Sequence, residues 1–172
     1  IYPTPMLGMV GLIESVEHTM TQWFKQDGDV IILLGKTKED LGGSEYLKVL
    51  HHREQGSPPF LSLETEQSLH DFLLKVIREG IVQSAHDCSD GGLAVALVES
   101  CISGPAERRG AVVRLSLDAL RRDALLFGES QSRVVLSVKP ELADRVLTLA
   151  GAAAVPAMKI GTVGGDRFVV EV

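Results

Sequence analysis

A short aliphatic run near the start of the chain constrains the fold most. Residues 30–34 read Val-Ile-Ile-Leu-Leu and are enclosed by Asp29 and Gly35. A short apolar run that is rich in β-branched residues and ends at a glycine is typical of a buried strand. We therefore predict a strand over residues 29–35 in the interior of the fold.

The remaining pattern mixes strands and helices. Residues 64–79 indicate a helix, because Gly80 follows where a C-cap is expected and apolar residues recur at helical spacing, namely Leu69, Phe72, Leu73, Val76 and Ile77. The other predicted helices are 45–52, 89–102 and 141–149, and the other predicted strands are 82–86, 111–117, 133–138, 158–163 and 168–172. Strands and helices do not alternate strictly. The pattern therefore favours an α+β fold, in which helices pack on a mostly antiparallel or mixed sheet of about four to six strands.

The length of the chain fits one domain. A chain of 172 residues, of which 45% are hydrophobic, can build one sizeable core. We assign residues 13–172 to this single domain. Residues 1–12 begin Ile-Tyr-Pro-Thr-Pro without an initiator Met and are predicted to be a linker, so the chain is expected to be a piece of a longer polypeptide.

Composition argues against several classes of protein. The net charge is -6 and the basic residues are scattered, so nucleic acid is not an expected partner. Mean hydropathy is only +0.15, and no apolar run approaches the roughly 18 residues of a membrane span. Cys88 and Cys101 lack the spacing of a zinc site or a disulfide framework, and a reducing cytoplasm is the expected compartment.

The first candidate site is the segment His-Asp-Cys-Ser-Asp-Gly-Gly at residues 86–92, where a predicted strand passes into a predicted helix. Free backbone N–H groups at such a junction favour anions. Asp87 and Asp90 would repel a bare phosphate, so the pattern suits Mg²⁺ held between a carboxylate and a phosphate. The candidates for contacts to a nucleotide or phosphate are His86, Ser89, Asp90, Gly91 and Gly92. A structural explanation is equally compatible with the sequence: Ser89 caps the helix and the glycines allow close packing.

The second candidate site is the segment Gly-Glu-Ser-Gln-Ser-Arg at residues 128–133. Its polar side chains offer donors and acceptors suited to a ribose or an amide, and Gly128 lets the chain turn toward such a ligand. The candidates for substrate contacts are Gly128, Glu129, Ser130, Gln131 and Arg133. Spacing alone favours the plainer alternative, in which solvated side chains begin an edge strand.

A third, weaker candidate for phosphate contacts is the glycine turn Gly42-Gly43-Ser44, in which Ser44 is expected to cap the helix that follows. Such turns occur in many folds, so a structural role is favoured. The sequence offers no Ser-His-Asp or Cys-His arrangement and no GxxxxGK[ST] loop. No catalytic residue is therefore assigned.

Considered together, these segments resemble the second half of the phosphoribosylformylglycinamidine synthase II family, which belongs to the aminoimidazole ribonucleotide synthetase superfamily. The resemblance covers essentially the whole chain and rests on Thr4-Pro5, 8–11, 29–35, 41–46, 86–97, 127–133 and 160–163. The strings Leu-Gly-Gly-Ser-Glu-Tyr and Gly-Glu-Ser-Gln-Ser-Arg speak against the selenophosphate synthetases, thiamine monophosphate kinases and hydrogenase maturation factors of this superfamily.

The resemblance implies a position within a larger ligase. Each unit of such enzymes joins an N-terminal nucleotide-binding domain to a C-terminal α+β domain, and this chain looks like the second C-terminal domain. Residues 1–12 would be the linker or first strand from the preceding nucleotide-binding domain. The implied reaction uses ATP and Mg²⁺ to activate the amide of formylglycinamide ribonucleotide, and ammonia then displaces phosphate. The family takes this ammonia from glutamine through a glutaminase subunit or domain.

The resemblance also implies roles for individual residues. By likeness to the first half of these enzymes, Asp87 would bind Mg²⁺, and Glu129, Ser130 and Gln131 would contact the ribonucleotide. The ATP-binding residues of the family lie largely in other domains, so the chain alone is expected to be inactive. It is also expected to form a homodimer through surface that those domains would cover. The alternative is a non-catalytic half that only stabilises its neighbours.

Overall fold

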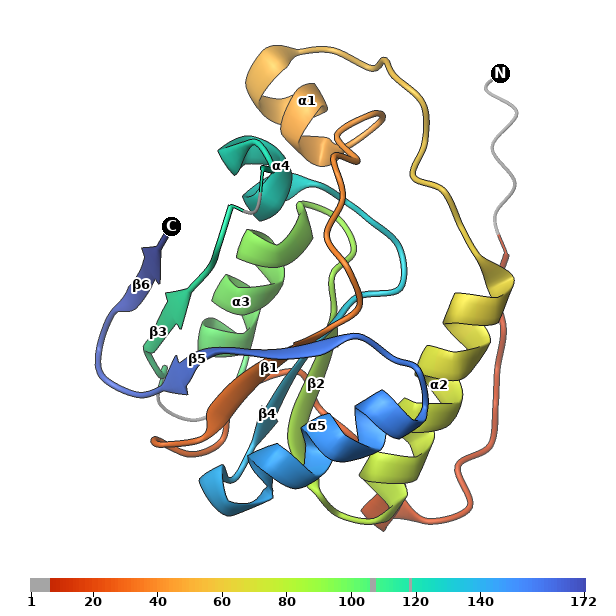
Figure 1. The fold of residues 1–172 in the computed structure, drawn as a ribbon, viewed down its shortest axis with the longest axis vertical. Coiled ribbons are helices and arrows are strands. Elements are labelled where there is room, and N and C mark those ends of the chain that lie inside the picture. The colour runs from red at the N-terminus through yellow and green to blue at the C-terminus, as the bar shows by residue number, and fades with distance from the viewer. Residues whose placement is uncertain (1–6, 106–107, 118) are drawn as a thin grey trace.

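The computed structural model describes residues 7–105, 108–117 and 119–172 (Figure 1). Residues 1–6, which include Thr4, Pro5 and half of the predicted linker, lie outside the described residues. One six-stranded sheet has the order β2-β4-β1-β5-β3-β6. Only β3 and β6 run parallel; the other four neighbouring pairs are antiparallel. The strands are β1 (Val30–Leu34), β2 (Val82–Asp87), β3 (Ala111–Arg114), β4 (Val134–Val138), β5 (Ala157–Val163) and β6 (Phe168–Glu171).

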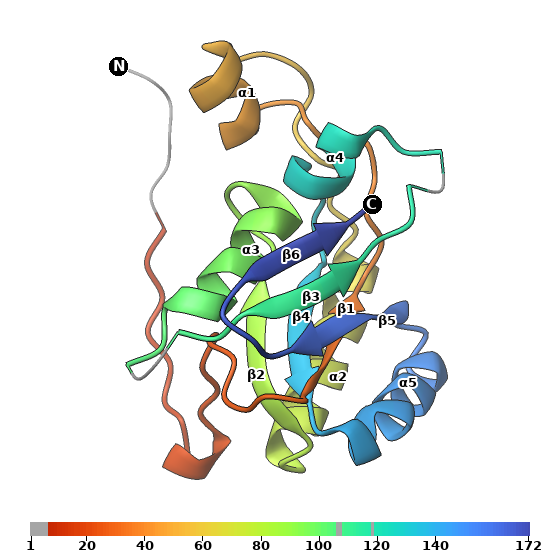
Figure 2. The ribbon, with the colours of Figure 1, turned by 90° about the vertical axis from the view of Figure 1, so that its left-hand side faces the viewer.

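Helices cover both faces of this sheet. Helix α3 packs on one face, whereas α2 and α5 pack on the other, as Figures 1 and 2 show. The α-helices are α1 (Glu45–His51), α2 (Leu63–Arg78), α3 (Gly92–Ile102), α4 (Arg122–Phe127) and α5 (Ala143–Ala152), and two 3₁₀ turns span Val16–His18 and Pro140–Leu142. Among the described residues, no helix has the length and apolar character needed to cross a membrane.

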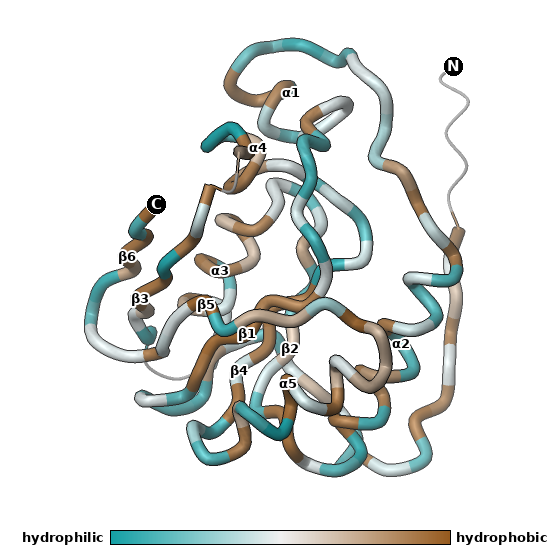
Figure 3. Tube along the Cα trace, viewed as in Figure 1, coloured by the Kyte–Doolittle hydropathy of each residue, from teal (hydrophilic) through white to brown (hydrophobic). Residues whose placement is uncertain are grey.

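The aliphatic run of β1 lies at the centre of the fold, as its sequence predicts. Its side chains alternate between two cores: Ile31 and Leu33 pack with the residues of α3, and Ile32 and Leu34 pack with those of α2 and α5. Figure 3 shows β1 as hydrophobic along its length. β1 pairs with β4 on one side and with β5 on the other, so both of its edges are enclosed, and the two cores cover its faces.

The predicted α+β class is confirmed, and the sheet has six strands. Two local predictions are wrong, and one helix was missed. The helix predicted from residue 89 begins at Gly92, because Gly91 and Gly92 have φ of 79° and 69°, so Gly91 rather than Ser89 occupies the N-cap position. The strand predicted over 111–117 ends at Arg114. Helix α4 was not predicted, because its six residues are too few to show a helical period.

Asp29 leads to a prediction about stability. The residue is 1% exposed, and its Oδ2 has no hydrogen-bond partner. Burial raises its pKa from the ordinary 3.8, with a smaller opposing effect from Lys139. A raised folded-state pKa stabilises the fold below about pH 4, and that stability is lost as pH rises through the folded pKa.

The variant Asp29→Asn has no carboxyl group to ionise at this position, so it should not lose stability in this way. Its melting temperature relative to that of the unmodified chain should therefore increase between pH 3.5 and pH 7. Asp166→Asn, in an exposed turn, is the control, and a pH-independent difference for Asp29→Asn would contradict the prediction.

Candidate functional site

Two of the predicted clusters meet at one cavity. Antiparallel pairing of β2 with β4 places Asp87 opposite Val134, and the backbone N–H of Cys88 donates to the carbonyl of Arg133 at 3.0 Å. The end of β2 and the start of β4 are thereby joined. The cavity that results is about 360 Å³ and is lined by Glu66, Leu69, His70, Asp87, Cys88, Ser89, Asp90, Glu129, Gln131, Ser132, Arg133 and Val134.

Glu129 connects all three predicted segments. Its Oε1 accepts hydrogen bonds from the backbone N–H of Gly91 at 2.8 Å and from that of Glu45 at 2.9 Å. Gly91 precedes α3, and Glu45 is the first residue of α1, directly after the turn Gly42-Gly43-Ser44. One carboxylate therefore caps the N-termini of two helices, where negative charge is favoured.

Arg133 and Ser130 hold the loop that carries Glu129. Arg133 is 2% exposed, and its guanidinium donates to the carbonyl oxygens of Ser130 and Gly128 and, at 3.1 Å, to Thr37 Oγ1. Burial lowers its pKa from the ordinary value. Ser130 Oγ accepts from the backbone N–H of Lys38 at 3.0 Å. The polar groups of Ser130 and Arg133 thus form hydrogen bonds within the protein, and Arg133 also lines the cavity.

Asp87 lines the cavity, and most of its side chain is exposed to solvent. Its side chain is 69% exposed, Ser89 Oγ donates to its Oδ2, and His86 Nδ1 lies 3.5 Å from its Oδ1. The Ser89 hydroxyl, opposed by partial burial, lowers the pKa of Asp87, so this carboxylate is charged at neutral pH. His86 Nε2 contacts Glu99 at 2.9 Å, away from the cavity.

Within the part of the chain that is described, no three His, Cys, Asp or Glu side chains form a preformed metal cluster. Asp87 and Asp90 both lie on the cavity wall. Mg²⁺ commonly takes one or two carboxylates and completes its shell with water and substrate phosphates, so the predicted role of Asp87 as a Mg²⁺ ligand stays a prediction.

The thiol in the cavity wall is held in its protonated form. Cys88 and Cys101 are both free and buried, and burial raises the pKa of each to about 11. The thiolate is the reactive form of cysteine, so burial disfavours the reactive form of both groups at neutral pH.

Chain packing accounts for several of the predicted glycines. A Cβ on Gly92 would lie 2.4 Å from the carbonyl oxygen of Gly128, and one on Gly42 would lie 2.1 Å from that of Ser57. Ser44 caps α1 as predicted, accepting from the backbone N–H of Leu47 at 3.4 Å. The turn Gly42-Gly43-Ser44 does not line the cavity.

Three polar residues of the cavity, namely Ser132, Glu66 and His70, were not named as candidate site residues from the sequence. Ser132 Oγ donates to Glu66 Oε1 at 2.6 Å, and Glu66 Oε2 lies 3.3 Å from His70 Nε2. Glu66 and His70 are one turn apart on α2, so only tertiary packing brings them to the loop. Ser132 has φ of 61°, unusual for a residue other than glycine, but this conformation leaves no mark in the sequence.

Comparisons with known proteins place the chain in a family. The family model described as AIR synthase related protein, C-terminal domain, matches residues 26–172. Phosphoribosylformylglycinamidine synthase subunit PurL of Caldanaerobacter subterraneus subsp. tengcongensis is 49% identical over 172 residues, which are 100% of this chain and 23% of that protein. The PurL subunit of Moorella thermoacetica is 48% identical over the same share. The chain thus spans about a quarter of the length of these relatives.

Solved structures share the fold. Thermotoga maritima PurL complexed with FGAR has a TM-score of 0.78 at 22% identity, covering 90% of this chain and 27% of that one. Thiamine-monophosphate kinase from Stenotrophomonas maltophilia has a TM-score of 0.55 at 21% identity, covering 88% and 52%. The resemblance seen in the sequence is confirmed at the level of the family: the chain belongs to the AIR synthase related proteins, and it is their C-terminal domain.

Proposed function

We propose that this chain is the C-terminal domain of the second half of a phosphoribosylformylglycinamidine synthase and that its cavity completes a magnesium-dependent ligand site of that enzyme. The parent would convert formylglycinamide ribonucleotide, ATP and glutamine-derived ammonia to the amidine. The observation that carries this proposal is the convergence of the two predicted clusters at one cavity, in a chain that matches PurL subunits over its whole length.

The proposed cofactors are ATP and Mg²⁺. A Thermotoga maritima structure is described as PurL complexed with ATP, which supports nucleotide use in proteins of this kind. Asp87 would hold the ion, with Asp90 beside it, and substrate oxygens would complete the shell. Gln131 and Ser132 would face the ligand, while Glu129, Ser130 and Arg133 would hold the loop that presents them.

The proposed context is a larger polypeptide. Residues 1–12 would connect a preceding nucleotide-binding domain to the domain of residues 13–172. Leu7, Met9, Val10 and Leu12 are each at least 91% exposed, which supports a covering partner in the parent. The same apolar surface would make the isolated chain dimerise, which light scattering would detect.

Further partners and the compartment are also proposals. A Thermotoga maritima structure described as PurLQS supports assembly with other subunits, and we propose a glutaminase among them. The cytoplasm is the proposed compartment, and it suits the two free thiols.

One observation favours a second candidate function, a purely structural half. The side chains of Ser130 and Arg133 and one oxygen of Glu129 are satisfied within the fold. A duplicated site that no longer binds its ligand could keep these hydrogen bonds within the protein. Asp87 distinguishes the two functions, because among the described residues its carboxylate contacts only its neighbours Ser89 and His86.

The test is the steady-state synthase rate of the full-length enzyme that contains this chain. Asp87→Asn should lower the rate at least about tenfold, equivalent to about 1.4 kcal/mol of barrier. The loss should be greatest at low Mg²⁺, because the charge that attracts the ion is gone. Asp166→Asn removes an equal charge from an exposed turn and should leave the rate unchanged. A fully active, normally melting Asp87→Asn enzyme would overturn the proposal in favour of the structural half.

A further inference from the structure

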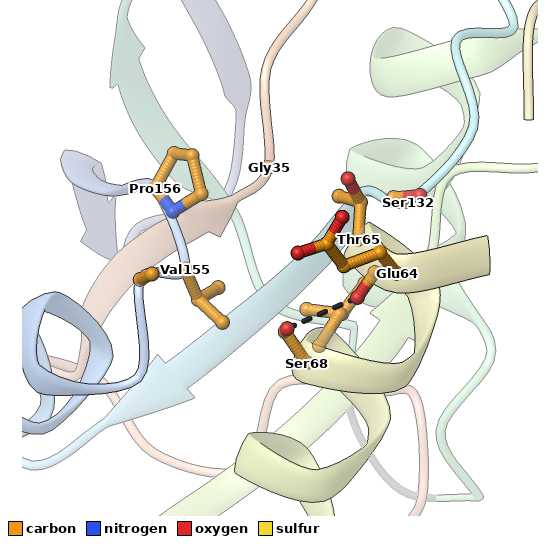
Figure 4. Close-up of a pocket in the computed structure, with 9 residues that line it drawn as sticks. Gly35, Glu64, Thr65, Ser68, Ser132, Val155 and Pro156 are labelled. Carbon is orange, nitrogen blue, oxygen red and sulfur yellow. Dashed lines mark hydrogen bonds between the residues drawn. The ribbon is translucent and has the colours of Figure 1, made fainter. Parts of the chain in front are cut away.

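Three cavities adjoin one another around Ser132, and together they form what we name the Ser132 groove. The cavity beside Asp87 shares Leu69 and Ser132 with a second cavity of about 300 Å³. The second shares Gly35, Thr65, Ser132, Ala154 and Pro156 with a third of about 230 Å³. Figure 4 shows the second cavity, with Glu64 and Thr65 on α2 facing Pro156 across it. The groove therefore extends from the end of β2 to the segment that follows β1.

The end of the groove away from Asp87 is basic. Lys36 and Lys38 follow β1 and line the third cavity, together with Ser62 and Thr65 at the start of α2. Within the described ranges, neither ammonium group lies within the 4.0 Å of a carboxylate that defines an ion pair. Two cations without a carboxylate partner at one cavity favour an anionic ligand, and the lysine ammonium is a common partner of phosphate.

An exposed aromatic ring adjoins these two lysines. Phe60 lines the same cavity, is 71% exposed, and lies beneath Lys38, whose Nζ is 5.8 Å from the ring centroid. A large apolar ring left in solvent beside cations is a surface on which a planar base can stack. An anion site beside a stacking surface matches the chemistry of a nucleotide.

We propose that Lys36, Lys38 and Phe60 form a binding site for a nucleoside monophosphate, with the phosphate on the two lysines and the base against Phe60. The site needs neither Asp87 nor Mg²⁺. It is therefore distinct from the magnesium-dependent site proposed at the other end of the Ser132 groove, and either proposal can fail without the other.

Glu64 limits where the phosphate lies. Its carboxylate belongs to the first turn of α2 and lines the second cavity, next to Thr65. Glu66, in the same turn, is engaged by Ser132 and His70. Negative charge at this helix end opposes a phosphate placed on the helix N-terminus itself, so the phosphate belongs on the lysine side. Removing the charge of Glu64 should strengthen binding, whereas removing the lysine charges should weaken it.

The experiment is an NMR titration of this chain with adenosine monophosphate in the presence of EDTA. The amides of residues 35–38 and 60–65 should shift, with a dissociation constant on the order of 0.1–1 mM. The double variant Lys36→Ala/Lys38→Ala should bind about tenfold more weakly and Glu64→Gln about twofold to fivefold more tightly, as expected for single charges near a surface. Adenosine without phosphate should bind about as weakly as the double variant binds the nucleotide, and inorganic phosphate should compete with the nucleotide.

Lys75→Ala serves as the matched control, because it removes a cation from the last turn of α2 and should leave the affinity unchanged. Lys36 and Lys38 are exposed, so their replacement should leave the melting temperature unchanged, and Lys36→Gln/Lys38→Gln repeats the test with longer side chains. Any one of three results would overturn the proposal. These are equal affinities for adenosine and its monophosphate, undiminished binding by the lysine variants, and amide shifts confined to other surfaces.

Discussion

Gly92→Ala should destabilise the domain by about 2–5 kcal/mol, which combines two separate costs. The residue has φ of 69°, and a side chain in the left-handed region costs about 1–2 kcal/mol. The added Cβ would also lie 2.4 Å from the carbonyl oxygen of Gly128 and 2.9 Å from the carbonyl carbon of Phe127, both of them backbone atoms. Overpacking of this kind typically adds about 1–3 kcal/mol. Urea denaturation of the chain measures the sum.

Gly43→Ala is the matched control. Gly43 has φ of 71°, nearly the same as that of Gly92, but a Cβ there would meet no atom within 4 Å. Its replacement should therefore show only the backbone cost, about 1–2 kcal/mol. Equal losses in the two variants would mean that backbone conformation alone requires glycine at position 92. The close approach of α3 to the loop at Gly128 would then contribute nothing.

The sequence predicts the elements of this fold better than their ends. Five apolar residues in a row specify β1, because only a strand enclosed on both faces can bury all of them. The pattern of α2 specifies a helix because one face is apolar and Gly80, with φ of 65°, ends it. The start of α3 could not be placed, because the polar residues before it suit a helix N-terminus, whereas two left-handed glycines delay the first turn.

The candidate site was predictable as a set of segments but not as an arrangement. Residues 86–92 and 128–133 stand out because polar residues and glycines interrupt apolar patterns. Their meeting depends on the register of β2 and β4, which pairs Asp87 with Val134 across nearly fifty residues of sequence. Nothing local encodes this pairing. The contribution of α2 through Glu66 and His70 was missed for the same reason.

The direction of each polar side chain is the second thing that the sequence does not encode. A Glu-Ser-Gln-Ser-Arg string offers the same donors and acceptors whether they face a ligand or the protein. In the fold, Arg133 lines the cavity together with Gln131, yet its guanidinium donates to carbonyl groups of its own loop. The same side chain therefore holds the shape of the loop and forms part of the cavity wall.

Glu129→Ala should be the second strongly destabilising change, with a loss of about 2–4 kcal/mol. The variant removes the acceptor of two backbone N–H groups, those of Gly91 and Glu45, and both bonds are partly buried. A buried donor left without a partner costs about 1–3 kcal/mol, and hydrogen bonds to charged groups lie at the stronger end of the range. Urea denaturation measures the loss, and amide hydrogen exchange at Gly91 and Glu45 should accelerate.

Glu129→Gln separates the shape of this side chain from its charge. The glutamine amide retains an oxygen that can accept from the same two N–H groups, so more than half of the lost stability should return. Glu129→Gln still lacks the negative charge that favours the N-termini of α1 and α3, which is worth typically about 0.3–1 kcal/mol for each helix. If Glu129→Ala instead kept its stability and slow exchange at both amides, the bond network would be incidental. The carboxylate would then be free to bind the ribonucleotide, as the resemblance to the synthase family implies.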